Sequence, residues 1–165
     1  MSKKNKFERK GYLFIKRIFD IICSGIAIII LSPIMIITAI AIMIESPGNP
    51  IFVQDRVGRN GKIFKMYKFR SMCIDAEERL KELKEKNEVD GPVFKMKNDP
   101  RITKVGRFIR KYSIDELMQL FNVFKGDMSV IGSRPALPKE VAEYDDLAKL
   151  RLKVKPGLSC YWQVM

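Results

Sequence analysis

Two adjacent carboxylates, Asp115 and Glu116, stand directly before an apolar run and are the residues best suited to chemistry. One interpretation is structural: Ser113 at a helix N-cap with Glu116 three residues later has the pattern of a capping box, and Asp115 would complement the helix dipole. The other is catalytic: the pair could hold a divalent cation, and one carboxylate could attack phosphorus to form an acyl phosphate. Adjacency alone leaves both interpretations open.

Basic side chains lie on both sides of this pair. Arg110 precedes the carboxylates and Arg134 follows them, and arginines clustered at a helix N-terminus form an anion site suited to a pyrophosphate. Further upstream, Lys68 and Arg70 alternate with apolar residues. That pattern predicts either an edge strand with one solvated face or side chains placed near phosphates. Arg101 is open to the same two interpretations.

The composition restricts the remaining chemistry. The chain of 165 residues has no histidine, which excludes imidazole bases, Ser-His triads and His-ligated metals. Proton transfer must therefore fall to a carboxylate, Lys or Tyr. The three cysteines, Cys23, Cys73 and Cys160, show no CxxC spacing and are interpreted as free thiols. The formal net charge of +12 favours acidic partners: lipid headgroups, nucleotides, pyrophosphates or nucleic acid.

An uncharged apolar segment, Ile21–Ile44, precedes all of these residues. As one straight helix it would reach ~36 Å, against roughly 30 Å of bilayer hydrocarbon. It is longer than the ~7–15 apolar residues of a signal peptide, and no small-residue cleavage site follows it. Ser32-Pro33 lies at its midpoint, where the proline predicts a kink. The Ser32 hydroxyl could bond the carbonyl that the proline leaves free.

Two membrane arrangements are compatible with this segment. The halves on either side of Ser32-Pro33 would each be ~16–18 Å long, about half of the hydrocarbon core, so a helix that enters and leaves on one face competes with a spanning helix. Basic flanks prefer the cytoplasm, which favours the re-entrant arrangement. We therefore expect a basic segment over 1–17, a re-entrant helix over 18–45 kinked at Ser32 and Pro33, and a catalytic domain over 46–165.

The catalytic domain is expected to be small, helix-rich and of the α+β class. Alternating apolar residues predict two strands, and Asn60-Gly61 between them is typical of a hairpin turn. Amphipathic patterns ended by Gly or Pro predict the helices. The expected elements are strands over 51–57 and 63–69 and helices over 75–87, 105–111, 115–124 and 138–150. These elements have to position the acidic and basic side chains against the membrane anchor.

Nine short motifs, taken in order, resemble those of the bacterial sugar transferase family, the monotopic phosphoglycosyl transferases. They cover nearly the whole chain from about Lys16 onward. The motifs are Lys16–Asp20, Leu31–Pro33, Gln54–Gly58, Tyr67–Met72, Asp99–Arg101, Ser113–Leu117, Lys125–Ser129, Gly132–Pro135 and Lys155–Leu158. The chain departs from the family pattern at Met118 and Ser133, where Pro is usual. The family normally continues beyond Met165 with further helices, so a C-terminally shortened form is expected.

The resemblance implies an activity and a set of roles. Asp115 would attack the sugar-bearing phosphorus of a UDP-sugar, releasing UMP, and undecaprenyl (polyprenyl) phosphate would then take the phosphosugar in a ping-pong reaction. Glu116 would hold Mg²⁺. This reaction would be the first membrane step of exopolysaccharide or glycoconjugate assembly, at the cytoplasmic face of the bacterial plasma membrane. The residues expected at the phosphates are Lys68, Arg70, Arg101, Arg110 and Arg134, of which the lysine and the last two arginines match family residues.

Two other functions are compatible with parts of the sequence. A non-enzymatic basic membrane adaptor would bind anionic lipid or a partner protein. In an adaptor Asp115→Asn would leave function intact, whereas in a transferase it would abolish UMP release. A membrane-tethered nucleic-acid binder is not expected, since no nucleic-acid motif is present and 19 acidic residues are scattered through the chain. A homodimer is left open.

Overall fold

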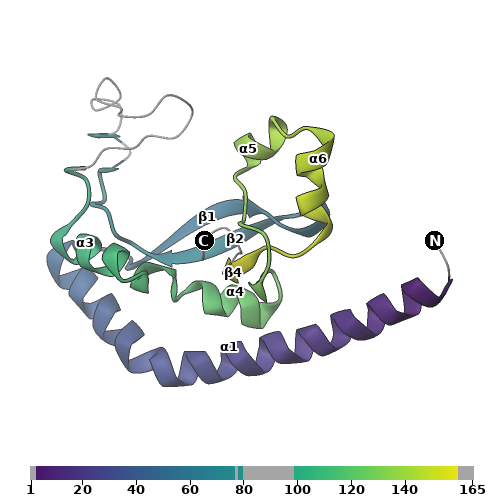
Figure 1. Cartoon of the computed structure of the whole chain (residues 1–165). Coiled ribbons are helices and arrows are strands. Elements are labelled where there is room, and N and C mark those ends of the chain that lie inside the picture. The colour runs from purple at the N-terminus through teal and green to yellow at the C-terminus, as the bar shows by residue number, and fades with distance from the viewer. Residues whose placement is uncertain (1–2, 77, 80–98, 160–165) are drawn as a thin grey trace.

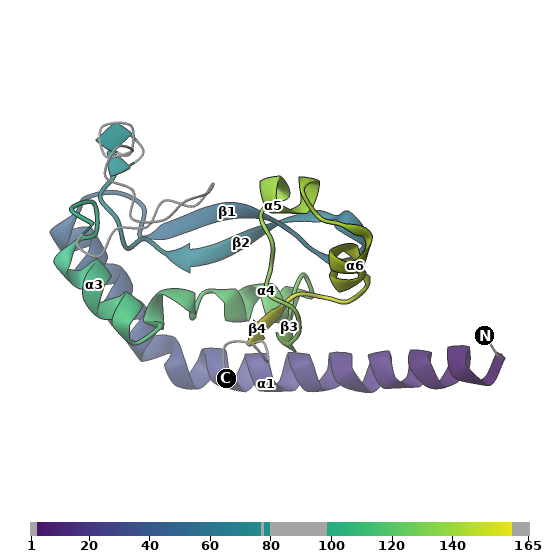
Figure 2. The same ribbon diagram turned by 45° about the horizontal axis from the view of Figure 1, so that its top comes forward.

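The computed structural model describes residues 3–76, 78–79 and 99–159, with side chains from residue 10 onward. One long helix, α1 (Lys3–Glu45), runs along one side of the molecule, and the hairpin of β1 (Ile51–Val57) and β2 (Ile63–Phe69) lies on the other (Figure 1). Between these two layers lies α4 (Gln119–Lys125), which contacts both (Figure 2). The architecture is mixed α+β, as the sequence predicts.

The helix α1 is continuous from Lys3 to Glu45 and includes Pro33. Proline has no N–H for the Ile29 carbonyl, and the Ser32 hydroxyl donates to that carbonyl at 2.8 Å, which confirms the expected compensation. By length and composition, the part over 10–45 could cross a membrane. The ribbon of α1 bends, so that its C-terminal part lies near α3 (Lys104–Lys111) (Figure 1). The helix begins well before residue 18, so the basic segment belongs to the same helix.

The hairpin has the predicted bounds. β1 and β2 pair antiparallel, with Ile51 opposite Phe69. Asn60 and Gly61 reverse the chain with positive φ angles of 59° and 78°, conformations that Asn and Gly adopt more readily than other residues. Because the turn and the buried face fix the register, Lys68 has a defined place near the end of β2.

Two hydrophobic clusters hold the layers together. The first joins the C-terminal half of α1 to the end of β2 and to α3, and its buried members are Met35, Ile42, Phe69 and Ile109. The second lies between β2 and α4 and the segment that follows α4, and its buried members are Phe64, Met66, Val123 and Met128. In the second cluster, which lies outside α1, each such side chain stabilises the fold by about 1.5–3 kcal/mol relative to one exposed to water. The two clusters therefore fix the hairpin and α4 against the long helix.

Asn122, which is fully buried on α4, attaches that helix to the second edge of β2. Its Oδ1 accepts from the Tyr67 N–H at 3.0 Å, and its Nδ2 donates to the Lys65 carbonyl at 2.7 Å. The side-chain amide thus takes the place of a neighbouring strand and satisfies two backbone groups of β2. The helix ends as predicted near Gly126, whose φ of 103° allows a left-handed cap.

The chain after α4 contains elements that the sequence did not predict. β3 (Ser129–Ile131) pairs in parallel with β4 (Gly157–Ser159). The single helix predicted over 138–150 is wrong, because α5 (Pro138–Ala142) and α6 (Asp146–Lys149) replace it. Asp145 has an extended backbone and accepts from the Ala148 N–H at 2.7 Å, so it starts a new helix instead of continuing the old one. The helix predicted over 75–87 lies largely outside the described residues.

Candidate active site

Asp115 and Glu116 lie on a short 3-10 helix, η3 (Ile114–Glu116), and α4 starts only at Gln119. The predicted helix over 115–124 is therefore two elements. Ser113, before the carboxylates, has a left-handed backbone with φ 55°, and its side chain makes no capping hydrogen bond. The capping-box interpretation is wrong, because an N-cap needs extended backbone and a side-chain bond to the helix. The local structure leaves both carboxylates available for other contacts.

Lys68 of β2 holds Glu116 in place. The Lys68 Nζ donates to the Glu116 Oε1 at 2.9 Å, and both side chains are partly exposed. A partly exposed ion pair contributes about 1 kcal/mol or less to stability, so its main consequence here is positional. The hairpin register and η3 together bring a lysine and a carboxylate 48 positions apart in the sequence into one hydrogen bond.

The environment of Asp115 disfavours its charge. Burial raises the pKa of Asp115 above its ordinary value, and the adjacent Glu116 carboxylate raises it further, while the positive charges of Lys68 and Arg110 oppose the shift. A carboxylate whose charge is under-compensated in a cleft is a candidate for nucleophilic or acid–base chemistry. The positive charges of Lys68 and Arg110 favour the ionised form of Asp115, which is the form that a nucleophilic role would need.

Three pockets meet at Glu116. A pocket of about 730 Å³ contains Asp115 and Glu116 with four of the expected phosphate residues, which are Lys68, Arg70, Arg101 and Arg110. A second, of about 460 Å³, adds the fifth expected residue, Arg134, to Lys68 and Glu116. The third, of about 560 Å³, is largely apolar and extends from Glu116 to Ala27 and Leu31 of α1. The structure thus places both carboxylates and all five expected phosphate residues around pockets that share Glu116.

The arginines of this neighbourhood differ in how they are bonded. The Arg110 Nε donates to the Ser71 hydroxyl at 2.8 Å, which fixes the guanidinium beside Asp115. The Arg70 Nη2 donates to the Ser46 carbonyl just after α1. Arg101 is 6% exposed, and its Nη2 donates to the Asp99 carboxylate at 2.6 Å. Arg101 therefore meets the pocket with much of its hydrogen-bonding capacity already used.

Two arginines of the second pocket were not singled out from the sequence. Arg56 of β1 donates to the Pro135 carbonyl at 3.0 Å and to the Gln54 Oε1 at 2.8 Å, and Arg151 lies on the same pocket. The Arg56 Nε is buried and has no hydrogen-bond partner among the described residues. Arg56 belongs to one of the family-like motifs, and this motif is the sequence signal that could have identified it as a site residue. Arg151 lies in none of the nine motifs, so the sequence offers no such signal for it.

A magnesium ion fits the donor set beside Asp115. No group of three or more Cys, Asp or Glu side chains suited to a metal occurs among residues 3–76, 78–79 and 99–159. Mg²⁺ does not need such a cage, because it commonly binds one or two carboxylates, several waters and substrate phosphates. Glu116 uses only its Oε1 toward Lys68, and Asp115 is adjacent. The residues therefore suit an ion that arrives with a pyrophosphate.

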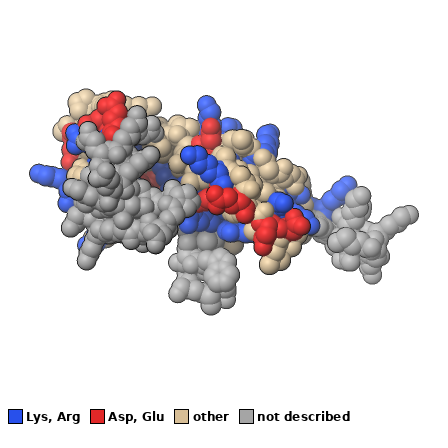
Figure 3. Space-filling view, turned by 90° about the horizontal axis from the view of Figure 1, so that it is seen from above, with Lys and Arg blue, Asp and Glu red and all other residues tan. Residues whose placement is uncertain are grey.

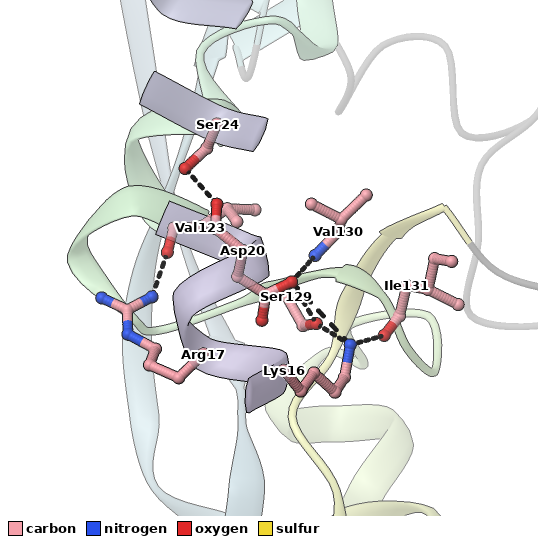
Figure 4. Close-up of polar contacts among 8 residues, drawn as sticks. All are labelled: Lys16, Arg17, Asp20, Ser24, Val123, Ser129, Val130 and Ile131. Carbon is pink, nitrogen blue, oxygen red and sulfur yellow. Dashed lines mark hydrogen bonds and ion pairs between the residues drawn. The ribbon is translucent and has the colours of Figure 1, made fainter. Parts of the chain in front are cut away.

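A polar seam fastens the end of α4 and the strand β3 to α1 (Figure 4). Arg17 donates from its two terminal nitrogens to the Val123 and Phe124 carbonyls at the end of α4, each at 2.7 Å. Asp20 is 2% exposed, and its Oδ1 accepts from the Ser129 hydroxyl at 2.9 Å and the Val130 N–H at 3.0 Å. Arg17 and Asp20 belong to the family-like motif Lys16–Asp20, and in the structure they form this docking contact.

Comparisons with known proteins identify the family of this chain. Residues 11–165 match the family described as "Bacterial sugar transferase". The chain is 48% identical over 160 residues to "Galactosyl transferase CpsE" of Streptococcus agalactiae, covering 96% of this chain and 35% of that protein. It is 47% identical over 165 residues to "Undecaprenyl-phosphate galactose phosphotransferase" of Salmonella typhimurium, covering 98% of this chain and 34% of that protein.

A shorter relative is matched over more of its length. The chain is 37% identical over 153 residues to "Exopolysaccharide production protein ExoY" of Rhizobium meliloti, covering 90% of this chain and 68% of that protein. Against the two longer relatives it spans only about a third of their length. The family match extends over α1, the hairpin and both carboxylates, and on this basis the chain belongs to the bacterial sugar transferase family.

Proposed function

We propose that this chain carries the catalytic part of a phosphoglycosyl transferase that moves a sugar-1-phosphate from a UDP-sugar to undecaprenyl phosphate. One observation carries the proposal: a partly buried Asp115 with a raised pKa lies beside a lysine-bound Glu116, where basic pockets meet an apolar pocket on α1. Two substrates, one polar and one lipid, could therefore reach the same carboxylates. The relative from Salmonella typhimurium is named as an undecaprenyl-phosphate galactose phosphotransferase and the one from Rhizobium meliloti as an exopolysaccharide production protein, and both names support the proposal.

The proposed reaction has two displacements at one phosphorus atom. First, an Asp115 carboxylate oxygen attacks the phosphorus that bears the sugar, and the bond from this phosphorus to the bridging oxygen breaks. UMP leaves with the electron pair, and the enzyme holds an aspartyl phosphosugar. An oxygen of undecaprenyl phosphate then attacks the same phosphorus and breaks the acyl-phosphate bond. The products are the polyprenyl diphospho-sugar and the original carboxylate.

The roles of the surrounding residues follow from their contacts. Arg110 is held by Ser71 beside Asp115 and would stabilise charge on the transferred phosphoryl group. Lys68 would fix Glu116 and meet the same phosphoryl oxygens. Arg134, with Arg56, would bind the departing nucleotide phosphate in the second pocket.

Arg70 and Arg101 take a more supporting part in this proposal. Both line the larger pocket, but Arg70 donates to the Ser46 carbonyl and Arg101 to the Asp99 carboxylate. Their positive charge would still act on the phosphates across the pocket. Mg²⁺ held by Glu116, when bound, would neutralise charge on the pyrophosphate and the leaving group.

We also infer a membrane arrangement in which α1 enters and leaves on the cytoplasmic face. Its apolar surface, the serine-compensated proline and the basic flanks support this arrangement, and the apolar pocket would receive the lipid acceptor from α1.

The test of this arrangement uses chains without native cysteines that carry Gly11→Cys or Lys62→Cys. An impermeant thiol reagent should label both from the cytoplasmic side of vesicles. Labelling from opposite sides would mean that α1 spans the bilayer.

The decisive experiment is incubation with a panel of UDP-sugars and undecaprenyl phosphate, with and without Mg²⁺, followed by UMP detection. Intact-mass analysis without the acceptor should find one phosphosugar adduct, which peptide mapping places on Asp115. Asp115→Asn should lose the adduct and the UMP, whereas Asp146→Asn, which neutralises a fully exposed side chain, should keep both. UMP release that persists in Asp115→Asn would refute the covalent mechanism. A membrane function that survives without any UMP release would favour the adaptor.

A further inference from the structure

A separate basic pocket lies between the N-terminal part of α1, β3 and the segment that leads into β4. Its volume is about 540 Å³, and it shares no lining residue with the three pockets around Glu116. Five cationic side chains line it against a single carboxylate, that of Asp20. The cations are Lys16, Arg17, Arg59, Lys153 and Lys155. Such an excess of positive charge in one pocket favours the binding of an anion.

Two of these cations are already engaged by the protein. Lys16 donates to the Ser129 hydroxyl and to the Ile131 carbonyl, and Arg17 caps the end of α4. The Asp20 carboxylate, for its part, accepts hydrogen bonds from β3. The one acidic side chain among the described lining residues is therefore already in use, and the uncompensated charge of the pocket comes from the remaining cations.

Three cations remain: Arg59, Lys153 and Lys155. None of them forms an ion pair with another described residue within 4.0 Å. Burial lowers the pKa of Lys155, and the positive charges of Arg17 and Arg59 lower it further, although Asp20 and Asp127 oppose them. The group is thus self-repelling, and an anion bound between its members would relieve the repulsion.

The rim of the pocket is apolar where it adjoins α1. Tyr12 and Ile131 are 63% and 64% exposed, and Leu13 and Val154 are exposed beside them. A small soluble anion has no apolar part that could contact this rim. A lipid has both a charged headgroup for the cations and an acyl chain for the rim. On the face seen from above the hairpin, by contrast, basic and acidic side chains are interspersed among the described residues (Figure 3).

We propose that this pocket binds the phosphate of an anionic phospholipid headgroup, with the acyl chain lying along Tyr12 and Leu13 of α1. The lipid would join the segment that carries Lys153 and Lys155 to the membrane surface, and so hold the catalytic part at a fixed height above the bilayer. The inference rests on the membrane association of α1 proposed above, and it does not depend on the transferase reaction.

The test measures lipid binding by the whole chain in detergent micelles, using native mass spectrometry with phosphatidylglycerol and, separately, phosphatidylcholine. We expect one retained phosphatidylglycerol per chain and no comparable phosphatidylcholine adduct. Lys153→Gln/Lys155→Gln should weaken phosphatidylglycerol binding about tenfold or more, because each cation near an anionic headgroup contributes separately. The matched control, Lys139→Gln/Lys149→Gln, removes the same charge from α5 and α6 outside the pocket and should bind like the native chain.

A second measurement locates the lipid and separates it from free phosphate. In nanodiscs containing phosphatidylglycerol, amide exchange should slow in residues 131–133 and 153–155, and inorganic phosphate added to lipid-free micelles should not reproduce that protection. Equal protection by inorganic phosphate, or equal loss of binding in both double variants, would overturn the proposal. Measuring Asp115→Asn in parallel keeps this result independent of catalysis, since that variant should bind the lipid normally.

Discussion

Two aspartates of this chain, Asp20 and Asp115, occupy opposite electrostatic situations. Asp20 is buried on α1, where its Oδ1 accepts hydrogen bonds from Ser129 and Val130 and lies 3.8 Å from the Lys16 Nζ. Asp115 stands on a short 3-10 helix at the edge of a pocket, and burial raises its pKa. The fold supplies donors to the first carboxylate, whereas it leaves the charge of the second only partly compensated.

The difference separates a residue that holds the fold from the residue proposed to do chemistry. A carboxylate with its hydrogen bonds supplied by the protein stabilises the structure but has little capacity left for a substrate. A carboxylate that folding makes less acidic costs stability when ionised, and it retains reactive lone pairs. The seam around Asp20 and the turn around Asp115 should therefore respond in opposite ways to substitution.

The largest effect is expected for Asp115→Asn, which should lower UMP release about 10³-fold or more because the proposed nucleophile is lost. Its melting temperature at pH 7 should stay the same or rise. A carboxyl whose pKa is raised in the folded state favours folding at low pH, and this contribution is lost as pH rises through the folded pKa, so at pH 7 the ionised group opposes folding. The gain should shrink as pH falls toward 4. Strong destabilisation at pH 7 would break the comparison.

Asp20→Ala should do the reverse. Removing this buried carboxylate leaves the Ser129 hydroxyl and the Val130 N–H without their acceptor, and we expect a loss of about 3 kcal/mol in unfolding free energy. Asp20→Asn should cost far less, because both hydrogen bonds end on Oδ1, an oxygen that Asn retains. Denaturant titration in micelles measures both, and UMP release per folded molecule should stay near the native rate. Equal losses for Ala and Asn would show that charge, not hydrogen bonding, holds the seam.

Lys68→Met sharpens the electrostatic side of the comparison. The lysine charge lowers the pKa of Asp115, so its removal should move the acid limb of the pH–rate profile to higher pH, and the rate at neutral pH should fall about 10- to 100-fold. The control, Lys65→Met, changes an exposed lysine on the same strand and should leave the profile in place. An unchanged acid limb in Lys68→Met would mean that Asp115 does not control that limb.

The smallest effect is expected for Ser32→Ala, which removes the hydroxyl that bonds the Ile29 carbonyl. A side-chain hydrogen bond in lipid contributes on average about 0.6 kcal/mol, so in the membrane arrangement proposed above the melting temperature should fall only slightly. Pro33→Ala restores the missing N–H and should make that hydroxyl dispensable, so Ser32→Ala added to Pro33→Ala should cost less than Ser32→Ala alone. Additive effects would show that the two positions are independent.

The sequence alone determined the elements whose causes are local. The strand bounds at 51–57 and 63–69 and the Asn60-Gly61 turn agree with the structure because alternation and turn preference act over a few residues. The bond from Ser32 to Ile29 was likewise foreseeable, since a proline and its neighbour decide it. The residues expected around the two carboxylates also lie together, and that expectation drew on the family resemblance as well as on charge.

Only the tertiary structure decided which local patterns were realised and which distant groups met. Ser113 and Glu116 have the residue types and spacing of a capping box. In the structure, however, the Ser113 backbone is in the left-handed conformation, and Glu116 accepts a hydrogen bond from Lys68, 48 positions away. Asp20 finds its donors 109 and 110 positions along the chain, on a strand that no periodicity predicted. A contact between segments depends on how the layers pack, and the packing of α1, α4 and the hairpin is cooperative. No short window of sequence contains that information.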